Sequence, residues 1–147
     1  MGPSSATERI EVLVVEDNPA DVRLIQEALG GDDKLRMHFA ANGIEALKFL
    51  RREGDLASAP RPQLVLLDLN MPRMDGRELL RRMKSDQTLG SIPVVVLTTT
   101  DSRRDINLAY QLGASCFLTK PPDLDDFFSM MGSIQRFWGE HAVLPAN

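Results

Sequence analysis

Four short hydrophobic runs in this chain each end in side chains suited to phosphoryl chemistry. Together these ends supply three carboxylates, one hydroxyl and one ammonium, namely Glu16 and Asp17, Asp68, Thr98, and Lys120. Short runs rich in β-branched residues are typical of strands that are buried on both faces. The carboxyl ends of parallel strands meet at one edge of a sheet, which is where open α/β folds bind ligands. The sequence therefore predicts that these five side chains share one crevice.

The three carboxylates predict a divalent-cation site. Acids clustered at the ends of buried strands repel each other and are costly to remove from water, and a cation relieves both effects. Mg²⁺, or Mn²⁺ in its place, prefers oxygen ligands, and a backbone carbonyl after Asp68 would add one. The alternative is that Glu16 and Asp17 only cap the first helix, but three acids exceed what capping needs.

Lys120 and Thr98 add two groups that can bind phosphoryl oxygens. The ammonium of Lys120 is a compact positive charge, and the hydroxyl of Thr98 can donate a hydrogen bond. Each has a plainer alternative: Lys120 forms a salt bridge with Asp68, and Thr98 satisfies a backbone group at the end of its strand. The neighbouring acids favour the phosphoryl interpretation.

The composition indicates one ordinary globular domain. The chain has 147 residues, of which 43% are hydrophobic and 26% charged, enough for a substantial core. The net charge is −4, so no broad basic surface is expected and nucleic-acid binding is disfavoured. No apolar run approaches the roughly 20 residues that cross a membrane. We expect a disordered leader over residues 1–8 and a single domain over 9–147 with no output domain.

The single cysteine, Cys116, cannot form a disulfide within the chain. An unpaired cysteine inside a predicted strand suits a reducing compartment, so we expect a cytoplasmic protein.

Segments of helical periodicity separate the predicted strands, among them an edge strand over residues 35–40. Capping residues and glycines place the helices at about residues 19–29, 43–53, 76–86, 103–112 and 124–141. Asn18 followed by Pro19 is a strong start for the first of them. The stretch 55–63 contains two prolines and is predicted to be a loop. Five strands that alternate with five helices predict a doubly wound parallel sheet.

The chain resembles the receiver domain of two-component response regulators over about residues 10–131. Four motifs in order carry the resemblance: the acidic pair in Val-Val-Glu-Asp-Asn, the segment Leu-Leu-Asp-Leu-Asn-Met-Pro that contains Asp68, the Leu-Thr-Thr strand end, and Thr-Lys-Pro. The resemblance implies a flavodoxin-like (βα)5 fold with strand order 2-1-3-4-5.

The resemblance also assigns roles to individual residues. It implies that Asp68 accepts a phosphoryl group from a phosphohistidine of a sensor histidine kinase. Glu16, Asp17 and Asp68 would hold Mg²⁺ with the backbone carbonyl of Asn70. Thr98 and Lys120 would bind the phosphoryl group. Thr98 and Phe117 would form the switch pair, and the Lys120–Pro121 bond would be cis.

The last helix carries more apolar residues than one buried stripe requires. We expect part of this set to pack on the sheet and part to form a homodimer interface through the last strand and helix, the interface residues being Phe127, Met131, Ile134, Phe137 and Trp138. The apolar tail and the proline-containing loop resemble the small regulators that are paired with bacterial phytochromes. The sequence predicts output through protein contacts, and this resemblance implies a role in a phytochrome light-signalling phosphorelay.

Two other classes of function are compatible with parts of the pattern. A phosphatase of the haloacid-dehalogenase type also uses an aspartyl nucleophile and Mg²⁺, but it expects an acid at the position of Asn70 and a nucleophile after the first strand. A pseudo-receiver would dimerise without phosphorylation, although the intact Asp68, Thr98 and Lys120 argue against it. Failure to be phosphorylated by a competent donor would identify the pseudo-receiver.

Overall fold

The computed structural model describes residues 9–31, 34–71 and 73–145. Five parallel strands form one sheet in the order β2-β1-β3-β4-β5. Their bounds are β1 Ile10–Val15, β2 Leu35–Ala40, β3 Leu64–Leu67, β4 Val94–Thr98 and β5 Cys116–Thr119. The flavodoxin-like (βα)5 fold and its strand order are therefore confirmed. The leader predicted over residues 1–8 lies outside the described residues.

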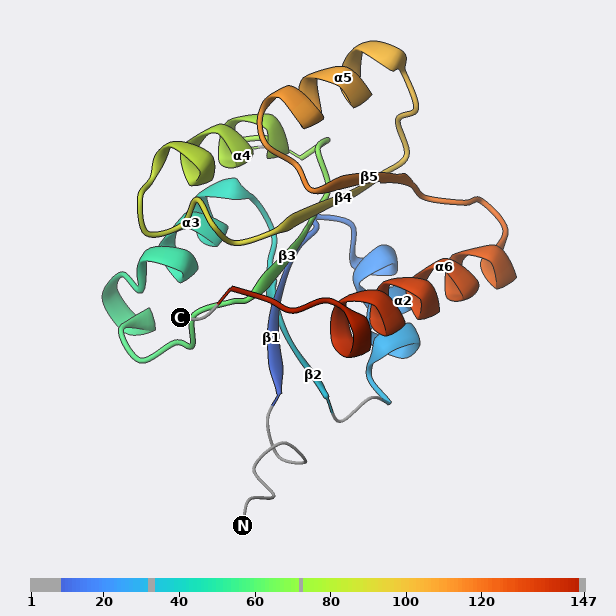
Figure 1. Cartoon of the computed structure of the whole chain (residues 1–147), viewed down its shortest axis with the longest axis horizontal. Helices are drawn as coiled ribbons and strands as arrows, with labels where there is room; N and C mark the ends of the chain where they lie inside the picture. Colours follow the sequence, from blue (N-terminus) through green and yellow to red (C-terminus); the bar gives the residue numbers. More distant parts are fainter. Residues whose placement is uncertain (1–8, 32–33, 72, 146–147) are drawn as a thin grey trace.

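Helices cover both faces of the sheet. Figure 1 shows α2 and α6 on one face and α3, α4 and α5 on the other. The bounds are α2 Pro19–Leu29, α3 Gly43–Arg51, α4 Gly76–Ser85, α5 Arg103–Gln111 and α6 Leu124–Arg136. Each helix begins after a residue whose side-chain oxygen accepts backbone N–H groups, these being Asn18, Asn42, Asp75, Ser102 and Asp123.

Two segments differ from the sequence-based expectation. The final helix, predicted as one element to about residue 141, changes to a π-helical turn, η2, over Phe137–His141. The predicted loop at residues 55–63 begins with a short 3₁₀ helix, η1, over Gly54–Leu56. Each of these single turns comes directly or closely after an α-helix, and hydrophobic periodicity cannot distinguish such a turn from the end of the helix.

The central strands send alternate side chains to two separate cores. Leu13 and Val15 of β1 belong to the core beneath α3 and α4, whereas Val12 and Val14 belong to the core beneath α2 and α6. Side chains of a strand alternate between the faces of its sheet, and helices cover both faces here. This explains why β1 and β3 are continuous hydrophobic runs rather than alternating ones.

Three residues that were predicted to form a dimer interface lie in the core instead. Phe127, Met131 and Ile134 are buried on α6 against the sheet and α2, so the interface prediction is wrong for them. Their spacing of four and then three residues places them on one stripe of the helix. Phe137 is 54% exposed, and Trp138 is partly buried. Only these two of the predicted interface residues remain available at the surface.

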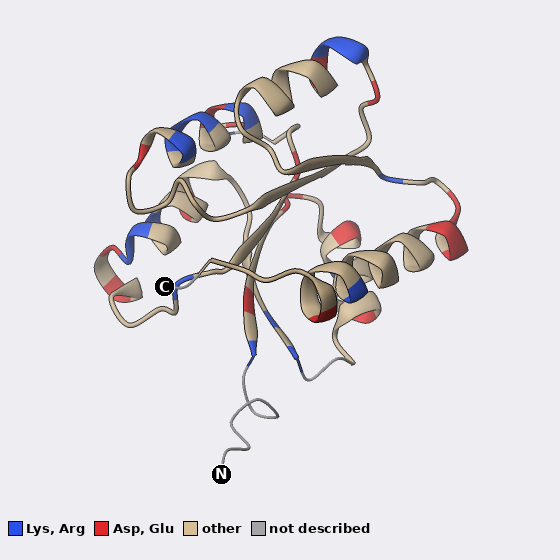
Figure 2. Ribbon diagram, viewed as in Figure 1, with Lys and Arg blue, Asp and Glu red and all other residues tan. Residues whose placement is uncertain are grey.

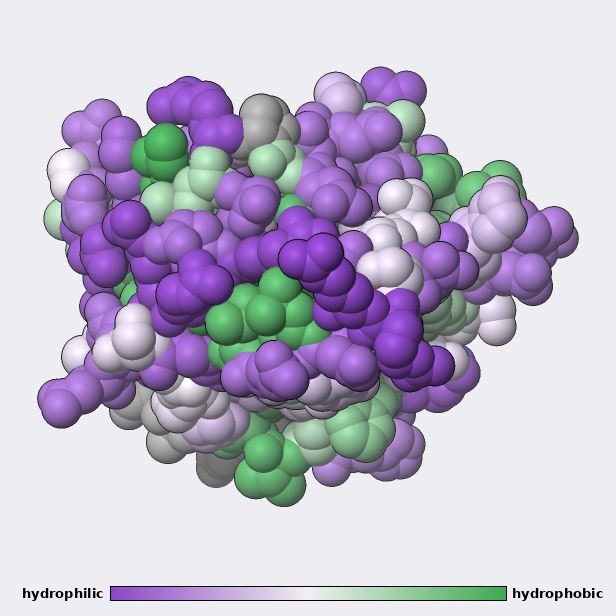
Figure 3. Space-filling view, turned by 90° about the horizontal axis from the view of Figure 1, so that it is seen from above, coloured by the Kyte–Doolittle hydropathy of each residue, from purple (hydrophilic) through white to green (hydrophobic). Residues whose placement is uncertain are grey.

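Lys and Arg are distributed over several elements of the part of the chain that the structure describes. Figure 2 shows Lys and Arg mainly along α4 and at the start of α5, and acidic residues at the start of α6. The face in Figure 3 is largely hydrophilic, with hydrophobic side chains gathered in a hollow near its centre. None of the helices within the described ranges combines the length and apolar character of a bilayer-spanning segment.

Candidate phosphoryl-transfer site

Backbone hydrogen bonds of the sheet extend to the residues predicted to do chemistry. Glu16 donates its N–H to the carbonyl of Ala40 at 3.0 Å, and Asp68 donates to Val15 at 3.0 Å. Lys120 donates its N–H to the carbonyl of Thr98 at 2.7 Å. The backbone at these three positions is therefore held by the sheet, and all five predicted residues lie at its carboxyl edge.

The carboxylate of Asp68 is held by two donors. The Thr98 hydroxyl donates to Oδ1 at 2.9 Å, and the backbone N–H of Asn70 donates to the same oxygen at 3.1 Å. The Asn70 side chain also donates from Nδ2 to Thr98 Oγ1, at 3.3 Å. The other carboxylate oxygen of Asp68, Oδ2, lies 3.6 Å from Lys120 Nζ. Asp68 is thus oriented by its neighbours while Oδ2 faces the ammonium.

Lys120 lies among three carboxylates. Its Nζ is 2.5 Å from Glu16 Oε1, 2.8 Å from Asp21 Oδ2 and 3.6 Å from Asp68 Oδ2. Burial alone would lower the pKa of Lys120, but the hydrogen bonds to Asp21 and Glu16 and the negative charges of Glu16 and Asp68 together outweigh it and raise the pKa. The ammonium therefore keeps its charge. The alternative of a simple Lys120–Asp68 salt bridge is incomplete, because two other acids lie closer.

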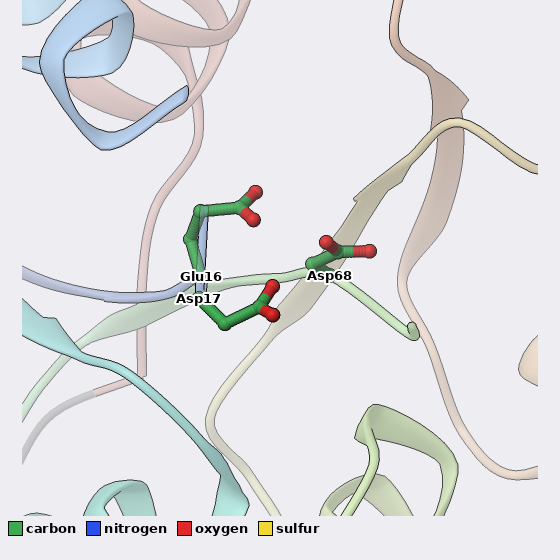
Figure 4. Close-up of side chains that lie close together, drawn as sticks. All are labelled: Glu16, Asp17 and Asp68. Atoms are coloured by element: carbon green, nitrogen blue, oxygen red, sulfur yellow. The ribbon is translucent and has the colours of Figure 1, made fainter. Parts of the chain in front are cut away.

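Glu16, Asp17 and Asp68 form a cluster that can hold a divalent cation. One carboxylate oxygen from each lies within 4.8 Å of the others, and Figure 4 shows Asp17 and Asp68 turned toward a shared space beside Glu16. Burial raises the pKa of Glu16 to about 7, against the opposing effect of Lys120. Burial makes Glu16 reluctant to ionise without further positive charge nearby. A cluster of oxygen ligands of this kind fits a hard divalent ion.

The site opens into a cavity of about 460 Å³. Its lining includes the three acids of the cluster, Asn70 and Lys120. A cavity with several carboxylates and one ammonium is suited to a metal ion together with an anionic group. Thr98 is fully buried behind Asp68.

The loop after Asp68 turns back so closely that only glycine fits at the start of α4. A Cβ on Gly76 would lie 2.5 Å from the carbonyl oxygen of Asp68 and 2.7 Å from the Cα of Leu69. The same loop holds Arg73 and Met74 at φ of 53° and 67°, in the left-handed region. Strained backbone of this kind concentrates at functional sites, and here it brings α4 against the Asp68 backbone.

Two further predictions concern this edge: the cis bond before Pro121, and the switch role of Phe117, which stays a prediction. All peptide bonds in the described part of the chain are trans, including Lys120–Pro121, so the predicted cis bond is not found. The trans form is the lower in free energy for most bonds before proline. Phe117 is partly buried against the core beneath α4, and its N–H donates to the Tyr110 hydroxyl at 3.1 Å.

Sequence reasoning missed Asp21 and the side chain of Asn70. Asp21 lies in the first turn of α2, where an acid is favoured by the helix dipole in any case. Nothing in the sequence distinguishes that role from a contact with Lys120, which is 99 residues away. Asn70 was assigned only through its backbone carbonyl, although its amide reaches Thr98.

Comparisons with known proteins agree with this geometry. A family model described as the response regulator receiver domain matches residues 12–131. Response regulator Rcp1 of Synechocystis sp. is 43% identical over 136 residues, which cover 92% of each chain. The structure of Rcp1 in its Mn(2+)-bound form matches with a TM-score of 0.89, at 43% identity, over 93% of this chain and 99% of that one.

A second solved structure is equally similar. It is described as the phosphorylated cyanobacterial phytochrome response regulator RcpA, and it matches with a TM-score of 0.91 at 45% identity, over 94% of this chain and 99% of that one. The matched region contains every residue of the site, from Glu16 to Lys120. The chain therefore belongs to the receiver domain family of response regulators.

Proposed function

We propose that this chain accepts a phosphoryl group on Asp68 from a phosphohistidine of a sensor histidine kinase. The observation that carries the proposal is the arrangement of Asp68 between the Thr98 hydroxyl, the Lys120 ammonium and two further acids. A carboxylate oxygen of Asp68 would attack phosphorus while the phosphorus–nitrogen bond breaks. The electron pair would stay on the imidazole nitrogen, which then takes a proton from solvent. Such a transfer depends mainly on positioning and charge neutralisation.

The proposed cofactor is Mg²⁺, held by Glu16, Asp17, Asp68 and the backbone carbonyl of Asn70. A divalent ion there would neutralise the oxygens of the incoming phosphoryl group. The neighbouring Thr98 and Lys120 would bind two of those oxygens. Thr98 is in hydrogen-bond contact with Asp68 before transfer, so movement of its hydroxyl to the phosphoryl group would signal to Phe117 on the adjacent strand.

Mg²⁺ affinity is expected to rise with pH and then level off near pH 7. The pKa of Glu16 in the folded protein is about 7, so below that pH the metal must displace its proton and above it there is no proton to displace. Isothermal titration between pH 5.5 and 8 should show affinity increasing by up to about tenfold per pH unit below pH 7. Glu16→Gln should bind more weakly and lose this slope. An unchanged slope in Glu16→Gln would contradict the assignment.

We further propose that the donor is a phytochrome-type kinase and that the protein acts in the cytoplasm. The similarity to Rcp1 and to the phytochrome response regulator RcpA supports the first point. The half-buried, unpaired Cys116 supports the second. Output would pass through contacts with other proteins.

Phosphotransfer profiling tests the choice of donor. A radiolabelled bacterial phytochrome kinase and a radiolabelled kinase from an unrelated pathway are each mixed with this protein. Label should move from the phytochrome kinase at least about tenfold faster than from the unrelated kinase. A preference of this size can arise from tighter binding of the transition state for the matched donor. Asp68→Asn serves as the control and should receive none. Faster transfer from the unrelated kinase would refute the phytochrome pairing but not the receiver function.

We propose a homodimer that uses the surface beside η2. Phe137 is 54% exposed and packs edge-to-face on Trp138 at a ring-centroid distance of 5.0 Å, and Val143 in the following segment is 97% exposed. Aromatic side chains exposed together are typical of protein interfaces. Sedimentation velocity should show a dimer that Phe137→Ala weakens. A wild-type monomer at high micromolar concentration would contradict this.

A further inference from the structure

One contact of Lys120 has no part in the proposed transfer. Lys120 donates from Nζ to Asp21 Oδ2 at 2.8 Å, while the distance from the same Nζ to Asp68 Oδ2 is 3.6 Å. The side chain of Lys120 is 6% exposed and that of Asp21 is 25% exposed. Lys120 is therefore closer to an acid on α2 than to the predicted phosphoacceptor.

Asp21 is fixed on a rigid element. It lies in the first turn of α2, which begins at Pro19 after the capping residue Asn18. Its backbone N–H donates to Asn18 Oδ1 at 3.4 Å. The carboxylate also lines both the cavity over Asp68 and a second cavity of about 560 Å³ between α2 and α6. Its position next to Lys120 is thus set by the start of the helix rather than by a mobile loop.

The ammonium of Lys120 has a limited number of donors. It carries three N–H groups, and Glu16 and Asp21 each accept one at 2.5 and 2.8 Å. The 3.6 Å separation from Asp68 is within ion-pair range but too long for a good hydrogen bond. A phosphoryl group on Asp68 would offer this ammonium new anionic oxygens. The third N–H group can donate to them, but the ion pair with Asp21 opposes any movement of the ammonium toward Asp68.

We propose that Asp21 is a positioning residue that holds Lys120 back from Asp68 until a phosphoryl group arrives. Asp21 is the more exposed of the two close partners, so its ion pair is the weaker and the first to open. This inference rests on the proposed function of Asp68 and goes beyond it, because it gives Asp21 control over how readily the site is loaded. Asp21 acts through Lys120 and does not touch the phosphoryl group.

Removal of the Asp21 charge is expected to favour binding of the phosphoryl group. In Asp21→Asn the ammonium no longer has to leave an ion pair, so affinity for the phosphoryl analogue beryllofluoride in the presence of Mg²⁺ should increase about two- to fivefold. The rate of loading by acetyl phosphate should increase by a similar factor. Asp21→Glu, which keeps the charge, should stay close to wild type.

Calorimetric titration with Mg²⁺ and beryllofluoride tests the proposal without any chemical step. Asp101→Asn is the matched control, since Asp101 lines the neighbouring cavity but makes no ion pair with Lys120 among the described contacts. The Asp21→Asn gain should vanish in a Lys120→Gln background if Asp21 acts through the ammonium. A gain in affinity that persists in the Lys120→Gln background, or an equal gain in Asp101→Asn, would show that loss of any nearby negative charge explains the effect. Either result would overturn the proposal.

The same experiment separates this proposal from the proposed function. If wild type binds beryllofluoride and is loaded by acetyl phosphate, but Asp21→Asn matches wild type, the positioning role fails and the receiver function stands. If wild type neither binds the analogue nor is loaded, the proposed function itself fails. Thermal unfolding of each variant shows whether a change in affinity reflects loss of the fold.

Discussion

Asp68→Asn is expected to abolish phosphorylation and to leave the fold intact. The amide lacks the nucleophilic charge of the carboxylate, so loading should fall by more than about a thousandfold. An asparagine oxygen can still accept the hydrogen bonds that Thr98 and Asn70 donate to Oδ1. The substitution also removes one acid from a crowded cluster, which relieves like-charge repulsion. The unfolding free energy should therefore be unchanged or slightly increased.

Intact-protein mass after incubation with acetyl phosphate and Mg²⁺ measures this effect. Asp55→Asn is the matched control, because Asp55 is an exposed aspartate on η1 outside the site. The control should gain one phosphoryl mass as wild type does. An adduct of equal yield in Asp68→Asn would move the acceptor to another residue.

Met131→Ala is expected to destabilise the fold strongly. Met131 is 0% exposed in the core between α6, α2 and the sheet. Truncation of a buried methionine removes its transfer free energy and leaves a cavity, so it should cost about 2–5 kcal/mol. Urea denaturation measures the loss of unfolding free energy. The dependence of that free energy on urea concentration should match wild type.

Phe137→Ala provides the contrast. Phe137 is 54% exposed, so its truncation should change the unfolding free energy by less than about 1 kcal/mol while weakening the dimer. If Met131→Ala leaves stability unchanged but weakens the dimer, the original interface prediction for Met131 would be restored. The pair of variants thus separates a core residue of α6 from a surface residue of η2, the turn that follows it.

The fold was predictable because its strands are unambiguous in sequence. The runs in β1 and β4 are rich in β-branched residues, and the run in β3 is a short apolar segment with prolines before it and Asp68 directly after it, so a strand is favoured over a helix in all three. Parallel connection through helices then brings the ends of these strands together. The convergence of Asp68, Thr98 and Lys120 follows from this topology alone.

The wrong predictions concern residues whose apolar character is clear from the sequence but whose orientation in the fold is not. The apolar residues of α6 outnumber one stripe, and periodicity cannot say which of them face the sheet. Met131 and Ile134 turned out to be core, whereas Phe137 lies on the turn that follows the helix. The ion pair of Asp21 with Lys120 was missed for a related reason: it depends on how the start of α2 sits over the end of β5, which no local pattern encodes.

The central claim is Mg²⁺-dependent phosphorylation of Asp68, and one mass measurement tests it most directly. Wild-type protein is incubated with acetyl phosphate in excess Mg²⁺ or in EDTA, and the intact mass is followed over time. We predict a single phosphoryl adduct with Mg²⁺, a strongly reduced yield in EDTA, and peptide mapping of the adduct to Asp68. A phosphoryl adduct that forms equally well in EDTA, or the absence of any adduct from both acetyl phosphate and a phosphorylated histidine kinase, would contradict the account.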